Sequence, residues 1–195
     1  PDADVSTAGR PGLRQADLQL TADQSGGEAR IAMTQGAFDL PGVLEEPLLP
    51  FDRLRAQLNW RVEPSASDSV APRVTLQIKD AQFANADLQG DLRGTWSTGA
   101  GNATGKTGSR YPGRLDLDAK LTQVTASRVF RYLPLGISAD VRHYVERAVR
   151  AGRVASATFR VKGDLNDFPF ADGGAKDNEF RIAAQVDKAS FAYVP

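Results

Sequence analysis

The fold is decided by a stretch in which apolar and polar side chains alternate, Leu54-Arg55-Ala56-Gln57-Leu58-Asn59-Trp60-Arg61-Val62. Successive side chains of a β-strand point to opposite faces of a sheet, so this stretch predicts a strand with one apolar and one polar face. Strands covered on both faces in a parallel sheet would instead be apolar throughout. The stretch therefore predicts an antiparallel sheet that is apolar on one face only.

The same period of two recurs along the chain, and turn formers separate the segments. The chain holds 18 Gly and 11 Pro in 195 residues, which is typical of many short strands. We expect a mainly β fold. The apolar faces either close on one another as a β-sandwich, the commoner outcome, or line an open groove. The alternating segments are 16–22, 54–62, 74–78, 88–96, 115–121, 155–161 and 180–186.

Three segments form a weak internal repeat. Residues 33–38, 78–83 and 186–191 share an aliphatic residue, a small residue and a phenylalanine at equal spacing. Five positions separate the aliphatic residue from the phenylalanine, and an odd separation moves a side chain to the other face of a regular strand. The small residue is therefore predicted to mark a bulge or bend that returns the phenylalanine to the apolar face.

One segment departs from the β pattern. Apolar residues recur at helical spacing from Val141 to Ala148, Ser138 is placed to cap the N-terminus, and Gly152 follows the end. We therefore expect one amphipathic helix near residues 138–151.

Residues 126–153 are also the most basic part of a chain whose 24 Lys and Arg balance 24 Asp and Glu. This segment contains six arginines and two carboxylates, which gives it a local charge of +4. The favoured interpretation is a solvated amphipathic helix whose apolar stripe, from Val141 to Ala148, covers the end of a sheet. The alternative is that its basic face contacts lipid headgroups or an acidic partner. The arginines for such a contact are Arg142, Arg147, Arg150 and Arg153.

Composition excludes several classes of function. A net charge of zero gives no field that attracts nucleic acid, so we expect no nucleic-acid partner. Without Cys there is no disulfide or cysteine zinc site, and the single His143 excludes any site with two imidazoles. No stretch is long and apolar enough for a membrane span. We expect a protein that is not an enzyme and needs no cofactor or metal.

Two patterns resemble catalytic motifs. Residues 101–107 resemble a phosphate-binding loop, but Pro112 follows where a helix would have to begin, and this favours a hairpin loop. Asp116 and Asp118 could form a carboxylate pair. They alternate with leucines, however, which favours the solvated face of a strand.

Two further patterns resemble metal sites. His143 and Glu146 share a helix face, but two ligands do not make a metal site, so a surface histidine is favoured. Residues 164–167 have the carboxylates and amide of a calcium loop. Phe168 stands where the next oxygen ligand is required, which favours a turn.

The C-terminal third has the pattern of a known family. Its most specific part is Gly163-Asp164-Leu165-Asn166-Asp167-Phe168-Pro169-Phe170, and Tyr132-Leu133-Pro134 and Ala148-Val149-Arg150-Ala151-Gly152 precede it. These motifs resemble the YhdP family of AsmA-like proteins. Gly94-Thr95-Trp96 and Pro112-Gly113-Arg114-Leu115 resemble the strand and loop pattern of the same family.

The resemblance implies a single AsmA-like β-rich module, residues 1–195, cut from a larger protein, with possible sub-units 1–122 and 123–195. Such proteins belong to the envelope of Gram-negative bacteria, anchored in the inner membrane and extending through the periplasm. Their curved antiparallel sheets form an apolar, β-taco-like groove that is thought to conduct phospholipid toward the outer membrane. The partners it implies are phospholipid, neighbouring modules of the same chain and envelope proteins.

The family has no catalytic motif to carry over. The resemblance therefore implies a lipid-binding segment of a bridge-like periplasmic protein that transfers phospholipid between the membranes and supports the outer-membrane barrier. The alternative is a structural β spacer or assembly factor that binds no lipid. The expected groove residues are Leu76, Ile78, Phe83, Leu92, Trp96, Leu115, Leu117, Phe159, Val161, Ile182 and Phe191.

Overall fold

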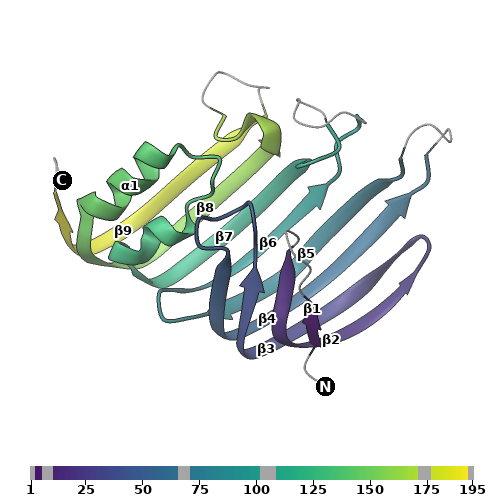
Figure 1. Ribbon diagram of the computed structural model, residues 1–195, viewed down its shortest axis with the longest axis horizontal. Coiled ribbons are helices and arrows are strands. Elements are labelled where there is room, and N and C mark those ends of the chain that lie inside the picture. Colours follow the sequence, from purple (N-terminus) through teal and green to yellow (C-terminus); the bar gives the residue numbers. More distant parts are fainter. Residues whose placement is uncertain (1–2, 6–10, 66–70, 102–108, 171–176, 193–195) are drawn as a thin grey trace.

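In the part of the chain that the structure describes, nine strands form one antiparallel sheet, and each strand pairs with the next along the chain. Figure 1 shows them side by side, from purple β1 to yellow β9. The computed structural model describes residues 3–5, 11–65, 71–101, 109–170 and 177–192. The strands are β1 (Ala3–Val5), β2 (Gly12–Asp23), β3 (Gly26–Asp39), β4 (Leu48–Glu63), β5 (Arg73–Ala84), β6 (Gln89–Ser97), β7 (Arg114–Thr125), β8 (Val149–Asp164) and β9 (Glu179–Phe191).

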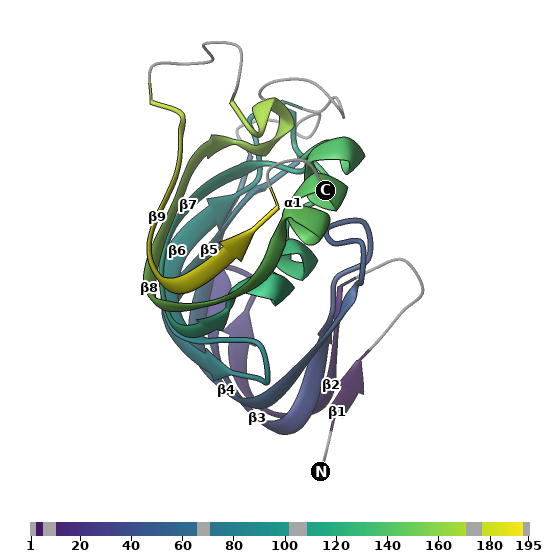
Figure 2. The ribbon, with the colours of Figure 1, turned by 90° about the vertical axis from the view of Figure 1, so that its left-hand side faces the viewer.

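The sheet curls without closing on itself. In the described ranges, β1 pairs with β2 and β9 pairs with β8, and these two strands remain the edges. Figure 2 shows the strands bending toward the side where the helices lie. The predicted curved antiparallel sheet is confirmed. The sandwich alternative is wrong, because the strands form a single sheet.

The strands bend where their register shifts. In β5 the register with β6 shifts between Ile78 and Ala81. Ala81 belongs to the apolar core, and Ile78 and Phe83 both pack against it, so all three lie on one face. The predicted return of the phenylalanine to the apolar face is therefore confirmed for residues 78–83.

The first repeat, in β3, bends in the same way. Gln35 takes a left-handed backbone conformation, with φ of 54°, between Met33 and Gly36. Met33 lies in the core and Phe38 packs against it, which confirms the prediction for residues 33–38. In the third repeat Lys188 has a similar φ of 51°, but the side chain of Phe191 lies outside the described part of the chain.

Two apolar clusters fill the inside of the bend. Residues beyond the register shifts pack against both clusters, Leu58 and Ile78 against the first and Ala157 against the second, which places the core where the register shifts. The first cluster consists of Ala16, Ile31, Met33, Leu44, Leu49, Phe51, Leu54, Ala56 and Ala81. The second consists of Leu88, Val124, Ala126 and Val154.

The connection from β7 to β8 contains two helices, η1 (Ala126–Tyr132) and α1 (Ala139–Ala148), and η2 (Leu165–Asp167) follows β8. Helix α1 is shorter than the predicted 138–151. It ends at Ala148 because the chain pairs with β9 from Val149 onward. Ser138 occupies the N-cap position, as predicted, although its side chain makes no capping hydrogen bond.

The orientation of α1 also differs from the prediction. Val141 and Tyr144, expected to face inward, are 50% and 44% exposed, whereas Arg142 is buried. Arg142 turns inward because its guanidinium donates to Glu45, 3.2 Å away, and to the carbonyl of Ile137. These polar contacts, rather than the apolar stripe, set the rotation of the helix.

Candidate functional site

The apolar side chains of the sheet form four continuous rows that run across the strands. Neighbours in a row are cross-strand partners, and every member is apolar or glycine. We call the face that bears them the inner face. The first row is Ala22, Gly27, Trp60, Leu76, Trp96, Leu115 and Gly163. The second is Leu20, Ala29, Leu58, Ile78, Gly94, Leu117, Val161 and Phe180. The third is Leu18, Ile31, Ala56, Ala81, Leu92, Ala119, Phe159 and Ile182. The fourth is Ala16, Met33, Leu54, Phe83, Gly90, Leu121, Ala157 and Ala184.

Burial differs along and between the rows. Met33 and Leu54 of the fourth row are each 3% exposed and form part of the core. Leu20 and Ile182, near the two ends of the second and third rows, are 58% and 54% exposed. The inner face is therefore packed at the bend and offers an accessible apolar surface away from it.

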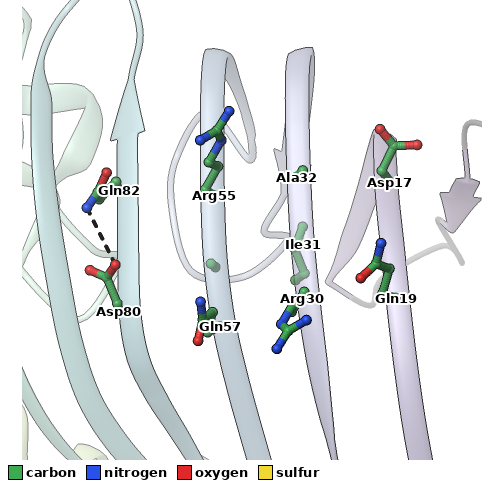
Figure 3. Close-up of a pocket in the computed structure, with 10 residues that line it drawn as sticks. Asp17, Gln19, Arg30, Ile31, Ala32, Arg55, Gln57, Asp80 and Gln82 are labelled. Atoms are coloured by element: carbon green, nitrogen blue, oxygen red, sulfur yellow. Dashed lines mark hydrogen bonds between the residues drawn. The ribbon is translucent and has the colours of Figure 1, made fainter.

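The outer face is polar. Arg160 of β8 pairs with both Asp116 and Asp118 of β7, at 3.0 Å for Asp118, so these carboxylates form the charged side of a strand, as predicted. A shallow hollow of about 420 Å³ lies on this face. Figure 3 shows the side chains that line it, over β2 to β5. Its polar lining mixes both charges with amides, namely Asp17, Gln19, Arg30, Arg55, Gln57, Asp80 and Gln82.

The connection from β7 to β8 covers part of the inner face. Leu44 and Pro134 form an isolated β-bridge, and the backbone N–H of Leu135 donates to the carbonyl of Val43 at 2.9 Å. Tyr132 packs against both apolar clusters. We call residues 126–138, together with the loop residues 43–46 that they meet, the clasp. The clasp joins two sides of the curved sheet over the bend.

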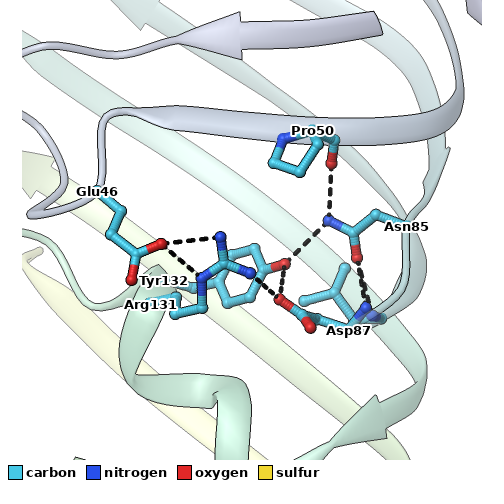
Figure 4. A network of polar contacts seen from close by, with 7 residues as sticks. Glu46, Pro50, Asn85, Asp87, Arg131 and Tyr132 are labelled. Carbon is cyan, nitrogen blue, oxygen red and sulfur yellow. Dashed lines mark hydrogen bonds and ion pairs between the residues drawn. The ribbon is translucent and has the colours of Figure 1, made fainter. Parts of the chain in front are cut away.

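A buried polar network anchors the clasp (Figure 4). Nη1 of Arg131 lies 2.6 Å from Oδ2 of Asp87, and Nη2 lies 2.8 Å from Oε2 of Glu46. The Tyr132 hydroxyl donates to Asp87 at 3.1 Å and accepts from Nδ2 of Asn85 at 2.9 Å. Asp87 is only 7% exposed, so these donors replace the water that would otherwise solvate its carboxylate.

Burial raises the pKa of Tyr132 to about 12, and the Asp87 carboxylate beside it acts in the same direction. The hydrogen bond from Asn85 opposes this shift. The hydroxyl therefore keeps its proton at every physiological pH and remains a donor to Asp87. The network pairs the Arg131 guanidinium with one buried carboxylate, Asp87, and one half-exposed carboxylate, Glu46.

The family was identified by comparison with known proteins. The model of one family, described as the YhdP protein, matches residues 5–195. The chain belongs to the YhdP family. This membership confirms the resemblance, implies an AsmA-like envelope protein and agrees with a role in lipid transport in general. No curated protein and no solved structure matches the chain.

The fold of this YhdP-family chain brings ten of the eleven expected groove residues into the four rows. Phe83 belongs to the packed fourth row and Val161 is 3% exposed, whereas Ile182 is open to solvent. The side chain of Phe191 lies outside the described part of the chain. The ten are Leu76, Trp96 and Leu115 in the first row, Ile78, Leu117 and Val161 in the second, Leu92, Phe159 and Ile182 in the third, and Phe83 in the fourth.

Several members of the rows were not among the expected residues. Leu18, Leu20 and Trp60 lie in segments 16–22 and 54–62, whose alternation already placed them on an apolar face. That signal could have identified them. Their proximity to the C-terminal strands depends on the register of the whole sheet.

The four arginines expected to form one basic surface are distributed differently. Arg142 is buried and paired with Glu45, and Nε of Arg147 donates to the carbonyl of His143 at 3.3 Å. Arg150 and Arg153 are exposed residues of β8 rather than of α1. The four arginines are therefore distributed over two elements, two in α1 and two in the first residues of β8.

The histidine also pairs with the loop of the clasp. Nε2 of His143 lies 3.3 Å from Oε1 of Glu45, and this hydrogen bond is the largest cause of the lowered pKa of Glu45, followed by Arg142. Across the ranges that the structure covers, no three potential metal ligands cluster together. No helix found there is long and apolar enough to cross a membrane.

The remaining motif residues form a turn. Oδ1 of Asp164 accepts from the backbone N–H of Asn166 at 3.0 Å and from its side-chain amide at 3.1 Å, which confirms the turn over 164–167. Most of the glycine-rich segment 101–107 lies outside the described residues.

Proposed function

We propose that the inner face of the sheet holds the acyl chains of phospholipids. The observation that carries this proposal is the continuity of the rows: the second and third, which reach the exposed residues Leu20 and Ile182, each cross eight strands with no polar member. Eight strands at about 4.8 Å spacing extend over about 34 Å, more than the roughly 15 Å that one leaflet gives an acyl chain. A chain lying along the rows would meet apolar surface over its whole length.

The physical role of such a surface is to lower the cost of moving lipid through water. Exposure of one methylene to water costs about 0.8 kcal/mol, so two chains with about thirty methylenes resist transfer by roughly 25 kcal/mol. A continuous apolar groove removes most of this barrier without any chemical step. Membership of the YhdP family supports this role, because it agrees with lipid transport in general.

In the complete protein, we propose, the module is one segment of a bridge through the periplasm, anchored in the inner membrane. The bridge transfers phospholipid between the inner and outer membranes and supports the outer-membrane barrier. The proposed partners are phospholipid, neighbouring modules of the same chain and envelope proteins, and the role involves no catalysis.

A structural spacer is the second candidate. It is favoured by the packed fourth row and the clasp, which together fill the bend without any ligand. In this alternative the exposed residues Leu20 and Ile182 have no ligand. The two candidates differ in whether the open ends of the rows bind lipid.

Purification without detergent should yield a module that retains phospholipid, at one molecule or less per chain, and that binds a fluorescent phospholipid saturably. Lipids extracted from the protein are identified by mass spectrometry. A β domain of similar size without a one-sided apolar sheet, purified identically, is the control. Lipid extracts that match the control, together with non-saturable binding, would support the spacer.

A further inference from the structure

An aromatic and cationic stack stands at the edge of the first row. Trp96, between Leu76 and Leu115 in that row, stacks on Tyr111, with ring centroids 6.2 Å apart and planes inclined by 20°. The guanidinium carbon of Arg110 lies 5.6 Å from the centroid of the Tyr111 ring. The stack therefore consists of the apolar Trp96 in the row, the amphipathic ring of Tyr111, which is 51% exposed, and the cationic Arg110.

The loop that presents this stack is held firmly in place. Each carbonyl from residue 110 to residue 113 accepts one hydrogen bond, so the backbone has little freedom to move the rings. The N–H of Gly99 donates to the carbonyl of Arg110 at 3.1 Å, and the hydroxyl of Ser109 donates to the carbonyl of Tyr111 at 2.7 Å. The indole N–H of Trp96 donates to the carbonyl of Pro112 at 2.8 Å, and the N–H of Leu165 donates to the carbonyl of Gly113 at 2.8 Å.

The family motif that begins at Gly163 supports the loop from behind. Nδ2 of Asn166 donates to the hydroxyl of Ser109 at 2.8 Å, and Ser109 and Asp164 are each 2% exposed. Gly113 has φ of +85°, and a Cβ there would lie 3.1 Å from Nε1 of Trp96. Only glycine allows the loop to approach the indole in this conformation.

The guanidinium of Arg110 has no ion-pair partner among the described residues. Nη1 donates to the carbonyl of Ala71 at 3.4 Å, and none of the described carboxylates lies within ion-pairing distance of the guanidinium. Arg131 and Arg160, in contrast, are each paired with two or more carboxylates. A guanidinium that retains free donors in a fixed position suits a phosphate oxygen.

We propose that Arg110 binds the phosphate of a phospholipid headgroup while the acyl chains lie along the rows. The order of groups matches the anatomy of the lipid: Trp96 meets the chains, Tyr111 lies at the level of the glycerol esters, and Arg110 meets the phosphate. This inference rests on the proposed function. It makes the stack a determinant of specificity for lipids that carry phosphate.

The test compares two fluorescent lipids with identical chains and fluorophore, phosphatidylglycerol and diacylglycerol, which differ in the phosphate-bearing headgroup. The wild-type module should bind phosphatidylglycerol about fivefold more tightly, since a charge-assisted hydrogen bond near water has about this effect. Arg110→Gln should bind both lipids with the affinity that the wild type has for diacylglycerol. The matched control is Arg114→Gln, an exposed arginine at the start of β7, which should retain the preference.

A positioning variant gives a second readout. Asn166→Ala removes the support of Ser109 and should reduce the preference for phosphatidylglycerol while leaving diacylglycerol binding unchanged. Equal binding of both lipids by the wild type, or a preserved preference in Arg110→Gln, would overturn the inference. Neither result would contradict the proposed binding of acyl chains along the rows. Binding of inorganic phosphate at Arg110, together with equal binding of the two lipids, would assign Arg110 to a free anion and overturn the inference as well. If neither lipid binds, the proposed function itself fails.

Discussion

Leu117→Asp should abolish phospholipid binding while the module remains folded. Leu117 is half-buried in the second row, between Gly94 and Val161, and belongs to neither core cluster. Without lipid, water can solvate the new carboxylate, so the melting temperature should fall by only a few degrees. With lipid, the carboxylate would lie unpaired against hydrocarbon at a cost of about 3 kcal/mol or more, which weakens binding at least about a hundredfold.

Thermal melts and titrations with a fluorescent phospholipid, made on the same preparation, measure both effects. The matched control is Thr158→Asp, which places the same charge on an exposed residue of the outer face of β8, and it should change neither. A Leu117 variant that unfolds outright would place the side chain in a dry core. One that stays folded with normal lipid binding would remove Leu117 from the lipid path.

Asp87→Ala should have the largest effect on stability. The Asp87 side chain is 10% exposed and accepts from both Arg131 and the Tyr132 hydroxyl, which fasten the clasp over the bend. Its loss leaves both donors without their shared acceptor, although Arg131 keeps Glu46. We expect a loss of about 2–3 kcal/mol in the free energy of unfolding, or roughly 5–10 °C in melting temperature.

The other carboxylate of the network provides the control. Glu46 is 52% exposed at its side chain, so Glu46→Ala removes an ion pair that water already screens, and it should cost less than about 1 kcal/mol. Unfolding in urea, followed by circular dichroism, compares the two variants. Equal and small losses for both would show that the network does not anchor the clasp.

The alternation of apolar and polar residues predicted most of the sheet, because a strand that is buried on one face only has this pattern in its sequence. It missed β3, where the apolar positions of the inner face include Gly27 and Ala29 and the outer face also carries Ala32. Small residues on both faces reduce the contrast between them. Ala155 illustrates the opposite error: it was assigned to the apolar face, but a register shift next to Val154 leaves it exposed.

The orientation of α1 could not be predicted from its own sequence. Arg142 is held by Glu45, which lies 97 positions earlier in the chain, and this contact outweighs the apolar stripe of the helix. The division of the rows into packed and open parts has a similar origin. Leu54 and Ile182 both belong to alternating segments, 54–62 and 180–186, but Leu54 lies in the first cluster and is 3% exposed, whereas Ile182 is 54% exposed.

The positions of the proposed groove residues on the sheet are predictable to the same degree as the sheet itself. Apolar alternation identified the inner face, and ten of eleven named residues lie in its rows. The stack of Trp96, Tyr111 and Arg110 was not predicted, because it depends on how the loop before β7 folds back onto β6. Such loop geometry leaves no periodic signal in the sequence.

The central claim is that lipid lies along the inner face, and site-specific photo-crosslinking in the full-length protein in cells tests it most directly. Neighbouring positions on the two faces provide matched pairs: Leu20 and Ile182 on the inner face, Gln19 and Ala183 on the outer face, all exposed. A photoreactive benzoyl-phenylalanine is placed at each position, and adducts are analysed by mass spectrometry. We predict phospholipid adducts at Leu20 and Ile182 and none at Gln19 and Ala183, whereas equal labelling of both faces, or none on either, would contradict the account.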